Sequence, residues 1–79
     1  MQNLLPTTEK NIKSLEGLGY QVSFHTEEKE YQMTGKFTAF IASIIKDGVN
    51  IQQVSSRHSY DDAFNSAYTI FQFVQSRKL

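Results

Sequence analysis

The stretch Lys36–Lys46, with the sequence KFTAFIASIIK, and the dipeptide Asp47-Gly48 that follows it decide the fold. The stretch is rich in β-branched and aromatic residues, which favour a β-strand. The dipeptide is favoured in the two-residue type I′ turn of a β-hairpin, because both turn positions require a positive φ. We therefore predict a strand over Lys36–Lys46 that turns at Asp47-Gly48 and pairs with a second strand over Val49–Ser55.

This turn also predicts the register of the hairpin, because a two-residue loop fixes which residues lie opposite each other. The predicted pairs are Lys46 with Val49, Ile44 with Ile51, and Ala42 with Gln53. Successive side chains of a strand point to opposite faces of the sheet. The face predicted to form the core carries Phe40, Ala42, Ile44, Val49 and Ile51.

Another strand is predicted before this hairpin, where apolar and polar residues alternate. The residues of its two faces are Tyr20, Val22 and Phe24 on one side, and Gln21, Ser23 and His25 on the other. The next stretch, Thr26–Glu30, contains three glutamates and one lysine and is predicted to be a solvated loop. The apolar side of this strand is expected to join the core.

Helices are predicted before and after the three strands. Pro6 suits the first turn of a helix, and Gly17 or Gly19 can supply the left-handed residue that ends it. Ser59 is predicted to cap the second helix, with Asp62 three residues later as in a capping box. The second helix is expected to extend to about residue 76. Its apolar stripe consists of Tyr60, Ala63, Phe64, Ala67, Ile70, Phe71 and Val74.

These elements predict an α+β fold of order α-β-β-β-α, in which a three-stranded antiparallel sheet carries both helices on one face. A chain of 79 residues has room for one core, so we predict a single domain over residues 1–79. The absence of cysteine excludes a disulfide framework and is typical of a cytoplasmic protein. No stretch approaches the ~20 apolar residues of a membrane span, and we expect no membrane partner.

The polar residues do not form a recognisable catalytic or metal-binding motif. His25 and His58 are the only histidines, and neither has a neighbour at metal-ligand spacing. The segment Ser55–Ser59, SSRHS, and the nearby Asp61 have the residue types of a catalytic triad, but consecutive loop residues do not form its geometry. The scattered glycines exclude a phosphate-binding loop. We therefore expect no catalytic residues, no metal and no cofactor.

The face of the sheet away from the helices carries an apolar stripe on the central strand. The stripe consists of Phe37, Ala39, Ile41 and Ile45, interrupted by Ser43. Its predicted polar borders are Gln21, Ser23 and His25 on one side, and Asn50 and Gln52 on the other. Because both helices are needed on the core face, we expect the stripe to be exposed in a monomer. Such a patch is typical of an interaction surface, although β-propensity alone is an alternative reason for it.

The leading hypothesis is therefore a non-enzymatic binding or regulatory protein. Its partner would be another protein or a second copy of the chain, which would give a homodimer. The expected contact residues are Phe37, Ala39, Ile41, Ile45 and Phe73. Phe73 is included because it lies among polar residues of the second helix, and packing over a strand edge is the alternative for this ring.

The order of elements, with Ser59 at the start of the last helix and the spacing of Ala63 and Ala67, resembles the double-stranded-RNA-binding domain fold. The resemblance covers most of the chain and implies a nucleic-acid-binding module as the alternative function. The residues that would serve it are Lys36, Arg57 and His58. The family's lysine cluster at the start of the last helix is replaced here by Asp61 and Asp62. The eight basic residues are also balanced by eight acidic ones.

Overall fold

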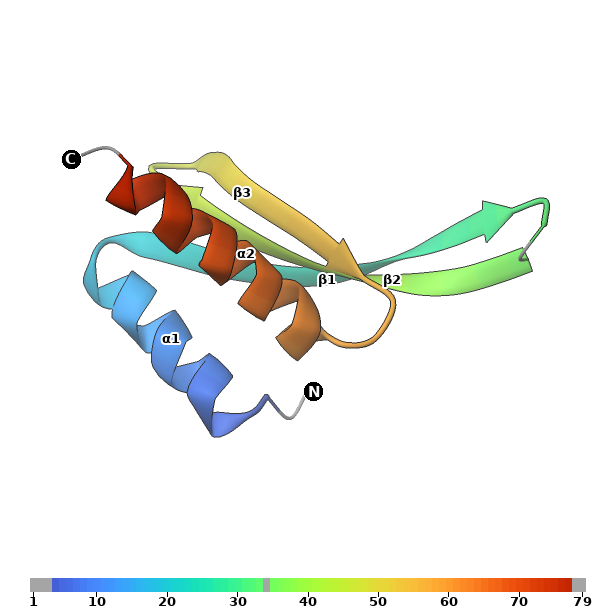
Figure 1. Cartoon of the computed structure of the whole chain (residues 1–79), viewed down its shortest axis with the longest axis horizontal. Coiled ribbons are helices and arrows are strands. Elements are labelled where there is room, and N and C mark those ends of the chain that lie inside the picture. Colours follow the sequence, from blue (N-terminus) through green and yellow to red (C-terminus); the bar gives the residue numbers. More distant parts are fainter. Residues whose placement is uncertain (1–3, 34, 78–79) are drawn as a thin grey trace.

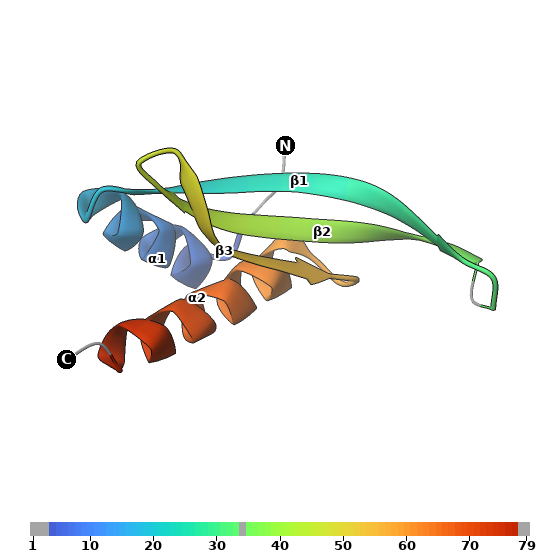
Figure 2. The same cartoon turned by 90° about the horizontal axis from the view of Figure 1, so that it is seen from above.

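The computed structural model describes residues 4–33 and 35–77 (Figure 1). Its elements are α1 (Pro6–Gly17), β1 (Tyr20–Tyr31), β2 (Gly35–Lys46), β3 (Val49–Ser56) and α2 (Tyr60–Ser76). The strands form one antiparallel sheet in the order β1-β2-β3. Both helices lie on the same face of this sheet (Figure 2). The predicted α+β fold of order α-β-β-β-α is therefore confirmed.

The core lies between the two helices and the sheet. α1 packs against β1, whereas α2 packs against β2 and β3. The buried members of the core are Leu15, Ala42, Ile44, Ala63, Phe64, Ala67 and Phe71. Phe64 is the largest fully buried side chain, and its ring lies beside those of Phe24 and Tyr68. The apolar stripe of α2 predicted from the sequence thus supplies most of the contact between the two layers.

The turn between β2 and β3 forms as predicted. Asp47 and Gly48 have φ angles of 53° and 78°, the left-handed region that a type I′ turn requires. Lys46 lies opposite Val49, so the pair closest to the turn is confirmed. The dipeptide alone is sufficient to place the start of β3.

Farther from the turn, a β-bulge shifts the register by one residue. The shift lies between Ile44 and Ile45, where β3 contains one residue more than β2. The observed pairs are Ile44 with Gln52 and Ala42 with Val54, so the predicted pairs Ile44 with Ile51 and Ala42 with Gln53 are wrong. A turn fixes the pairs beside it, and an extra residue in one strand then changes every later pair.

The bulge also changes which residues of β3 face the core. Val54 packs against the buried cluster. The predicted core positions Val49 and Ile51 are instead 60% and 42% exposed. Two apolar side chains at the start of β3 are therefore in solvent.

β1 is longer than predicted, and the solvated loop over Thr26–Glu30 is wrong. These residues continue the strand and pair with residues 36–40 of β2. Their charges do not prevent pairing, because the side chains remain in solvent on both sides of the strand. Lys29 Nζ forms an ion pair with Glu27 Oε1 at 3.0 Å, and Lys36 Nζ lies 3.8 Å from Glu30 Oε2 across the hairpin.

The lengthened hairpin projects from the rest of the molecule. β3 pairs only with Phe40–Lys46 of β2, so the outer parts of β1 and β2 have no third strand beside them. We call residues 27–31 and 35–39 the arm. Figure 1 shows it extending away from both helices.

The Ser59 cap at the start of α2 forms as predicted, but the Asp62 side chain of the expected capping box accepts a hydrogen bond from Ser56 Oγ instead. Ser59 is the N-cap residue, and its Oγ accepts a hydrogen bond from the Asp62 backbone N–H at 3.0 Å. This bond satisfies one of the N–H groups that the first turn of a helix leaves without a partner. The cap therefore fixes where the chain leaves β3 and enters α2.

We expect Ser59→Ala to lower the free energy of unfolding by about 1 kcal/mol, because the hydroxyl acceptor is lost. Ser66→Ala is the matched control, since Ser66 is exposed within the same helix and alanine has the higher helix propensity. Urea unfolding followed by circular dichroism measures both variants. Equal midpoints for the two would show that the Ser59 cap contributes nothing to stability.

Candidate functional site

The apolar stripe of β2 is largely covered in the monomer. Ala39 and Ile41 are each 3% exposed, and Phe37 and Ile45 are half-buried. The expectation of an exposed stripe is therefore wrong for Ala39 and Ile41. Ile41 pairs with residues of both β1 and β3, whose side chains shield it without a helix, whereas Ala39 lies in the arm and pairs with β1 alone.

Hydrogen-bonded polar side chains complete this cover. Ser43 Oγ donates to Gln53 Oε1 at 3.2 Å, and Asn50 Nδ2 donates to the same oxygen at 2.7 Å. The prediction that Gln52 borders the stripe is wrong, because the bulge places Gln53 opposite Ser43 and Gln52 opposite Ile44. This face of the sheet is a polar surface with the apolar residues beneath it.

Phe37 is covered by a different arrangement at the base of the arm. Its ring centroid lies 5.3 Å from that of Tyr31, and the Arg57 guanidinium carbon lies 4.1 Å from the same centroid. A guanidinium at this distance is attracted to the ring electrons. The end of β3 is therefore attached to the arm by an aromatic and cationic stack.

The three residues of the nucleic-acid alternative have separate surroundings. Arg57 lies on Phe37, while Lys36 lies beside Glu30. His58 donates its backbone N–H to Ser56 Oγ at 2.9 Å. The basic side chains of the arm thus lie next to glutamates, which repel phosphate.

Lys29, the second basic residue of the arm, is also paired with a glutamate. A hydrogen bond from Lys29 holds the pKa of Glu27 below its usual value, and His25, 3.3 Å away, acts in the same direction. The same hydrogen bond raises the pKa of Lys29. These three side chains therefore form a row of mixed charge along β1.

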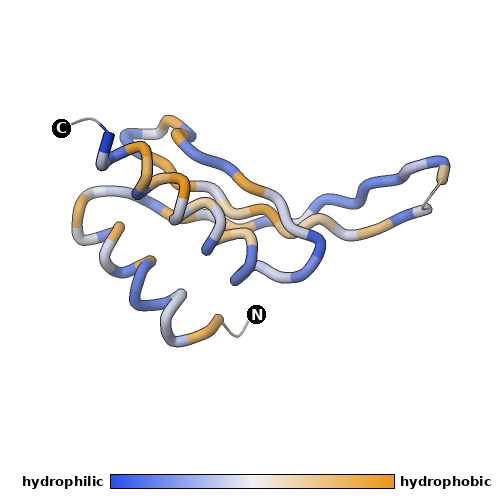
Figure 3. Tube along the Cα trace, in the orientation of Figure 1, coloured by the Kyte–Doolittle hydropathy of each residue, from blue (hydrophilic) through white to orange (hydrophobic). Residues whose placement is uncertain are grey.

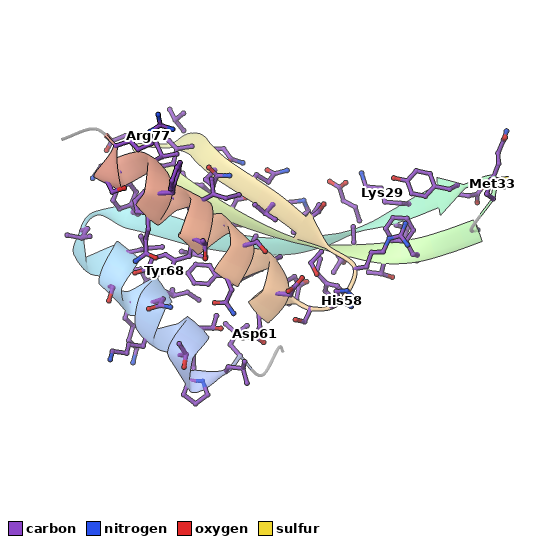
Figure 4. The ribbon with its side chains drawn as sticks, in the orientation of Figure 1. Lys29, Met33, His58, Asp61, Tyr68 and Arg77 are labelled. Atoms are coloured by element: carbon purple, nitrogen blue, oxygen red, sulfur yellow. The ribbon has the colours of Figure 1, made fainter. Side chains whose placement is uncertain are left out.

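The serine, histidine and aspartate residues around position 59 have structural contacts. Ser56 Oγ donates to Asp62 Oδ2 at 2.6 Å, and Asp61 Oδ1 accepts the Leu5 backbone N–H at 2.9 Å. Figure 4 shows His58 and Asp61 apart from each other, at the end of the sheet from which the arm extends. These contacts join β3, α2 and the start of α1.

A hollow of about 420 Å³ lies between the helices, where α1 and α2 diverge. Its apolar lining residues are Leu15, Leu18, Tyr20, Tyr68 and Phe71, and its polar ones are Ser14, Gln72 and Gln75. The lining contains no charged side chain. The hollow therefore offers packing and neutral hydrogen bonding, without an acid or a base.

Most exposed apolar side chains of the described residues belong to β3 and α2. Five of the nine large ones are on these two elements: Val49, Ile51, Ile70, Phe73 and Val74. We call them the β3–α2 residues. Phe73 is the most exposed of the five at 61%, and Arg77 lies 5.4 Å from its ring centroid. Figure 3 shows hydrophobic segments on both elements.

The same two elements lack charge along almost their whole length. The sequence contains no charged residue over Val49–Ser56 or over residues 63–76. Other elements of the fold do carry charge, as in Glu27–Glu30 of β1. Of the β3–α2 residues, only Phe73 was predicted from the sequence to be a contact residue, whereas Val49 and Ile51 were assigned to the core face and Ile70 and Val74 to the apolar stripe of α2. The two uncharged runs are the signal by which the others could have been found.

Within the described residues, no group of three or more potential ligands is placed to hold a metal ion. No helix in the same part of the chain is long and apolar enough to cross a membrane. No protein-family model matches the chain, and neither the curated proteins nor the solved structures with which it was compared gave a significant match. The resemblance to the double-stranded-RNA-binding domain fold stays a prediction.

Proposed function

We propose that this chain is a non-enzymatic binding protein of the cytoplasm that acts by contacting another protein through β3 and α2. The observation that carries the proposal is the gathering of exposed apolar side chains on these two elements. Exposed apolar groups on a small domain are typical of interaction sites. The proposed contact surface is therefore the β3–α2 residues and not the stripe of β2, where Ala39 and Ile41 are buried.

The distribution of charge supports the same surface. The centres of protein interfaces are depleted in charged residues and enriched in aromatic ones, and their rims are polar. β3 and α2 meet this description, with Phe73 inside the uncharged run over residues 63–76 and Arg77 near its ring just beyond the end of that run. Charged residues follow at the ends of both elements, as with Asp47 before β3 and Arg77 after α2.

The structural use of the polar residues also supports a binding function. Ser56 and Asp61 each make a hydrogen bond that joins two secondary-structure elements, and Ser59 caps the first turn of α2. Lys36 lies beside a glutamate, so phosphate binding has less support than protein contact. Lys36, Arg57 and His58 therefore remain the residues of an alternative that no contact in the structure favours.

The test compares two variants that place a glutamate at an exposed apolar position. Phe73→Glu is expected to abolish partner binding, because it puts a charge in an uncharged contact surface. Leu18→Glu is the matched control, since Leu18 is 67% exposed at the end of α1, outside the β3–α2 residues. Tagged forms of the wild type and both variants are crosslinked in the source cell, and each captured protein is then tested again with purified components.

The proposal requires a direct partner that the wild type and Leu18→Glu bind and Phe73→Glu does not. It is wrong if Phe73→Glu retains every directly binding partner. It is also wrong if Leu18→Glu alone loses them, because the contact would then lie beside the hollow between the helices.

A further inference from the structure

We propose that the partner at this surface is a second copy of the chain, which pairs its β3 edge antiparallel with the β3 edge of the first copy. The two sheets would then form one continuous six-stranded sheet about a two-fold axis. This inference rests on the proposed function and specifies its partner. Three features support it: the edge of β3, the exposed side of α2, and the charges at the ends of both elements.

β3 is an edge strand, and its second half has none of the usual protection against pairing. It contacts only β2 within the sheet, and backbone groups alternate in direction along a strand, so about half of its N–H and C=O groups point away from β2. Natural edge strands are usually blocked by charged side chains, proline or bulges. β3 has no charge and no proline. Its bulge lies near its start, which leaves the regular segment Gln52–Ser56 available.

The opposite edge of the sheet is protected. β1 is also an edge strand, but its outer half consists of Glu27–Glu30, with three glutamates and one lysine. Charged side chains on an edge strand hinder its pairing with another chain. The contrast between the edges directs self-association to β3.

The exposed side of α2 lies on the same side of the molecule as this edge. Tyr68 and Gln72 face α1, where they line the hollow with Leu15. Ile70, Phe73 and Val74 share the other side of the helix, because residues three and four apart fall on one face. Figure 2 shows α2 on the β3 side of the molecule and α1 on the β1 side. Pairing of β3 would therefore bring the apolar side of each α2 toward the second copy.

The charges at the two ends are complementary under this symmetry. An antiparallel pair places the start of one β3 beside the end of the other, so pairing over Gln52–Ser56 puts Arg57 opposite Ile51 of the second copy, at the end that carries the turn with Asp47. Arg77 follows α2 at the end opposite Asp62, and Figure 4 shows Arg77 far from Asp61. The same rotation therefore directs Arg77 toward the acidic start of the second α2. Opposite charges across a contact favour its formation and fix its orientation.

The first measurement is the molar mass in solution by light scattering. The wild type is expected to have twice the 9.1 kDa mass of one chain. Phe73→Glu is expected to raise the dissociation constant roughly a hundredfold, as loss of a central aromatic contact does. Leu18→Glu is expected to remain a dimer. A wild type that stays monomeric at millimolar concentration overturns the second-copy inference, while the proposed function is still decided by the capture test with Phe73→Glu.

The second measurement identifies the paired edge. The chain has no cysteine, so a nitroxide label attaches only where a cysteine is introduced. Gln53→Cys and Ser23→Cys form a matched pair, because Gln53 and Ser23 both lie opposite Ser43, one on each edge strand. In the six-stranded sheet, the two labels at position 53 are separated by one strand spacing, about 5 Å across the strands. The two labels at position 23 are separated by five strand spacings, about 24 Å.

The label distance at position 53 must therefore be the shorter of the two in spin-resonance measurements on dimeric samples. A shorter distance at position 23 would show that the chain dimerises through β1 and would overturn the β3 assignment. Equal distances would also overturn it, because they place neither edge at the axis.

Discussion

Phe64→Ala is expected to lower the melting temperature by about 15 to 30 °C, since each kcal/mol corresponds to about 4 to 8 °C in a domain of this size. The Phe64 side chain is fully buried between α2 and the sheet, beside Phe24 and Tyr68. Replacing a buried phenylalanine with alanine costs about 3 to 5 kcal/mol, because packing is lost and a cavity remains. Scanning calorimetry or circular dichroism measures the change.

This loss is large because the domain is small. A chain of this length is stabilised by only about 4 to 12 kcal/mol in total, so Phe64→Ala is expected to leave an appreciable unfolded population at 37 °C. Phe64→Leu is the conservative control and keeps most of the volume. Met33→Ala controls for the deletion itself, since Met33 is 96% exposed at the tip of the arm. A melting temperature within a few degrees of the wild type for Phe64→Ala would refute this description of the core.

Ile41→Glu is expected to destabilise the fold by about 3 kcal/mol, because it places an unpaired carboxylate in a site that is only 3% exposed. Ile41 lies between His25 and Ser55 in the sheet, and neither offers a fixed positive charge. The loss should be smaller at pH 4 than at pH 7, because protonation removes the buried charge. Urea unfolding at both pH values measures it.

Two controls separate burial from the addition of charge. Ser23→Glu introduces the same group at an exposed position on the same face of the sheet and should change stability little. Ile41→Val removes one methylene group and should cost about 0.5 to 1.5 kcal/mol. If Ile41→Glu unfolds at the wild-type urea concentration, the stripe of β2 is open to solvent, as the sequence analysis expected.

The parts of the fold that depend on short-range signals could be predicted from the sequence. The Asp47-Gly48 turn, the Ser59 cap and the alternation after Tyr20 each involve a few neighbouring residues whose conformational preferences are strong. The period of the apolar residues then placed α2 on the core. Element order and fold class follow from these local features.

The bulge and the arm could not be predicted in the same way. A bulge depends on how two strands pack against the rest of the molecule, and β3 carries no turn residue at Ile51 that would mark it. Thr26–Glu30 has a composition typical of a loop, but its backbone is held by pairing with residues 36–40. In both cases the partner strand determines the local structure.

The candidate site was predicted in part. Phe73 was expected to lie outside the core and is 61% exposed. The stripe around Ile41 was predicted to be exposed because no helix is available for that face, but side chains of neighbouring strands also cover it. The exposure of Ile51 follows from the bulge, so it could not be predicted before the register was known, whereas Val49 is exposed although it keeps its predicted partner Lys46.

The arm has a consequence for how this protein moves through a solvent or a gel matrix. The chain measures 44 × 27 × 21 Å and has a radius of gyration of 13.6 Å, whereas a compact chain of this length has one of about 12 Å. An elongated particle experiences more friction than a sphere of equal mass. A single copy should therefore elute early from a sizing column and sediment slowly, with the apparent size of a heavier protein. Elution volume or sedimentation rate alone would therefore overestimate the number of copies in the assembly.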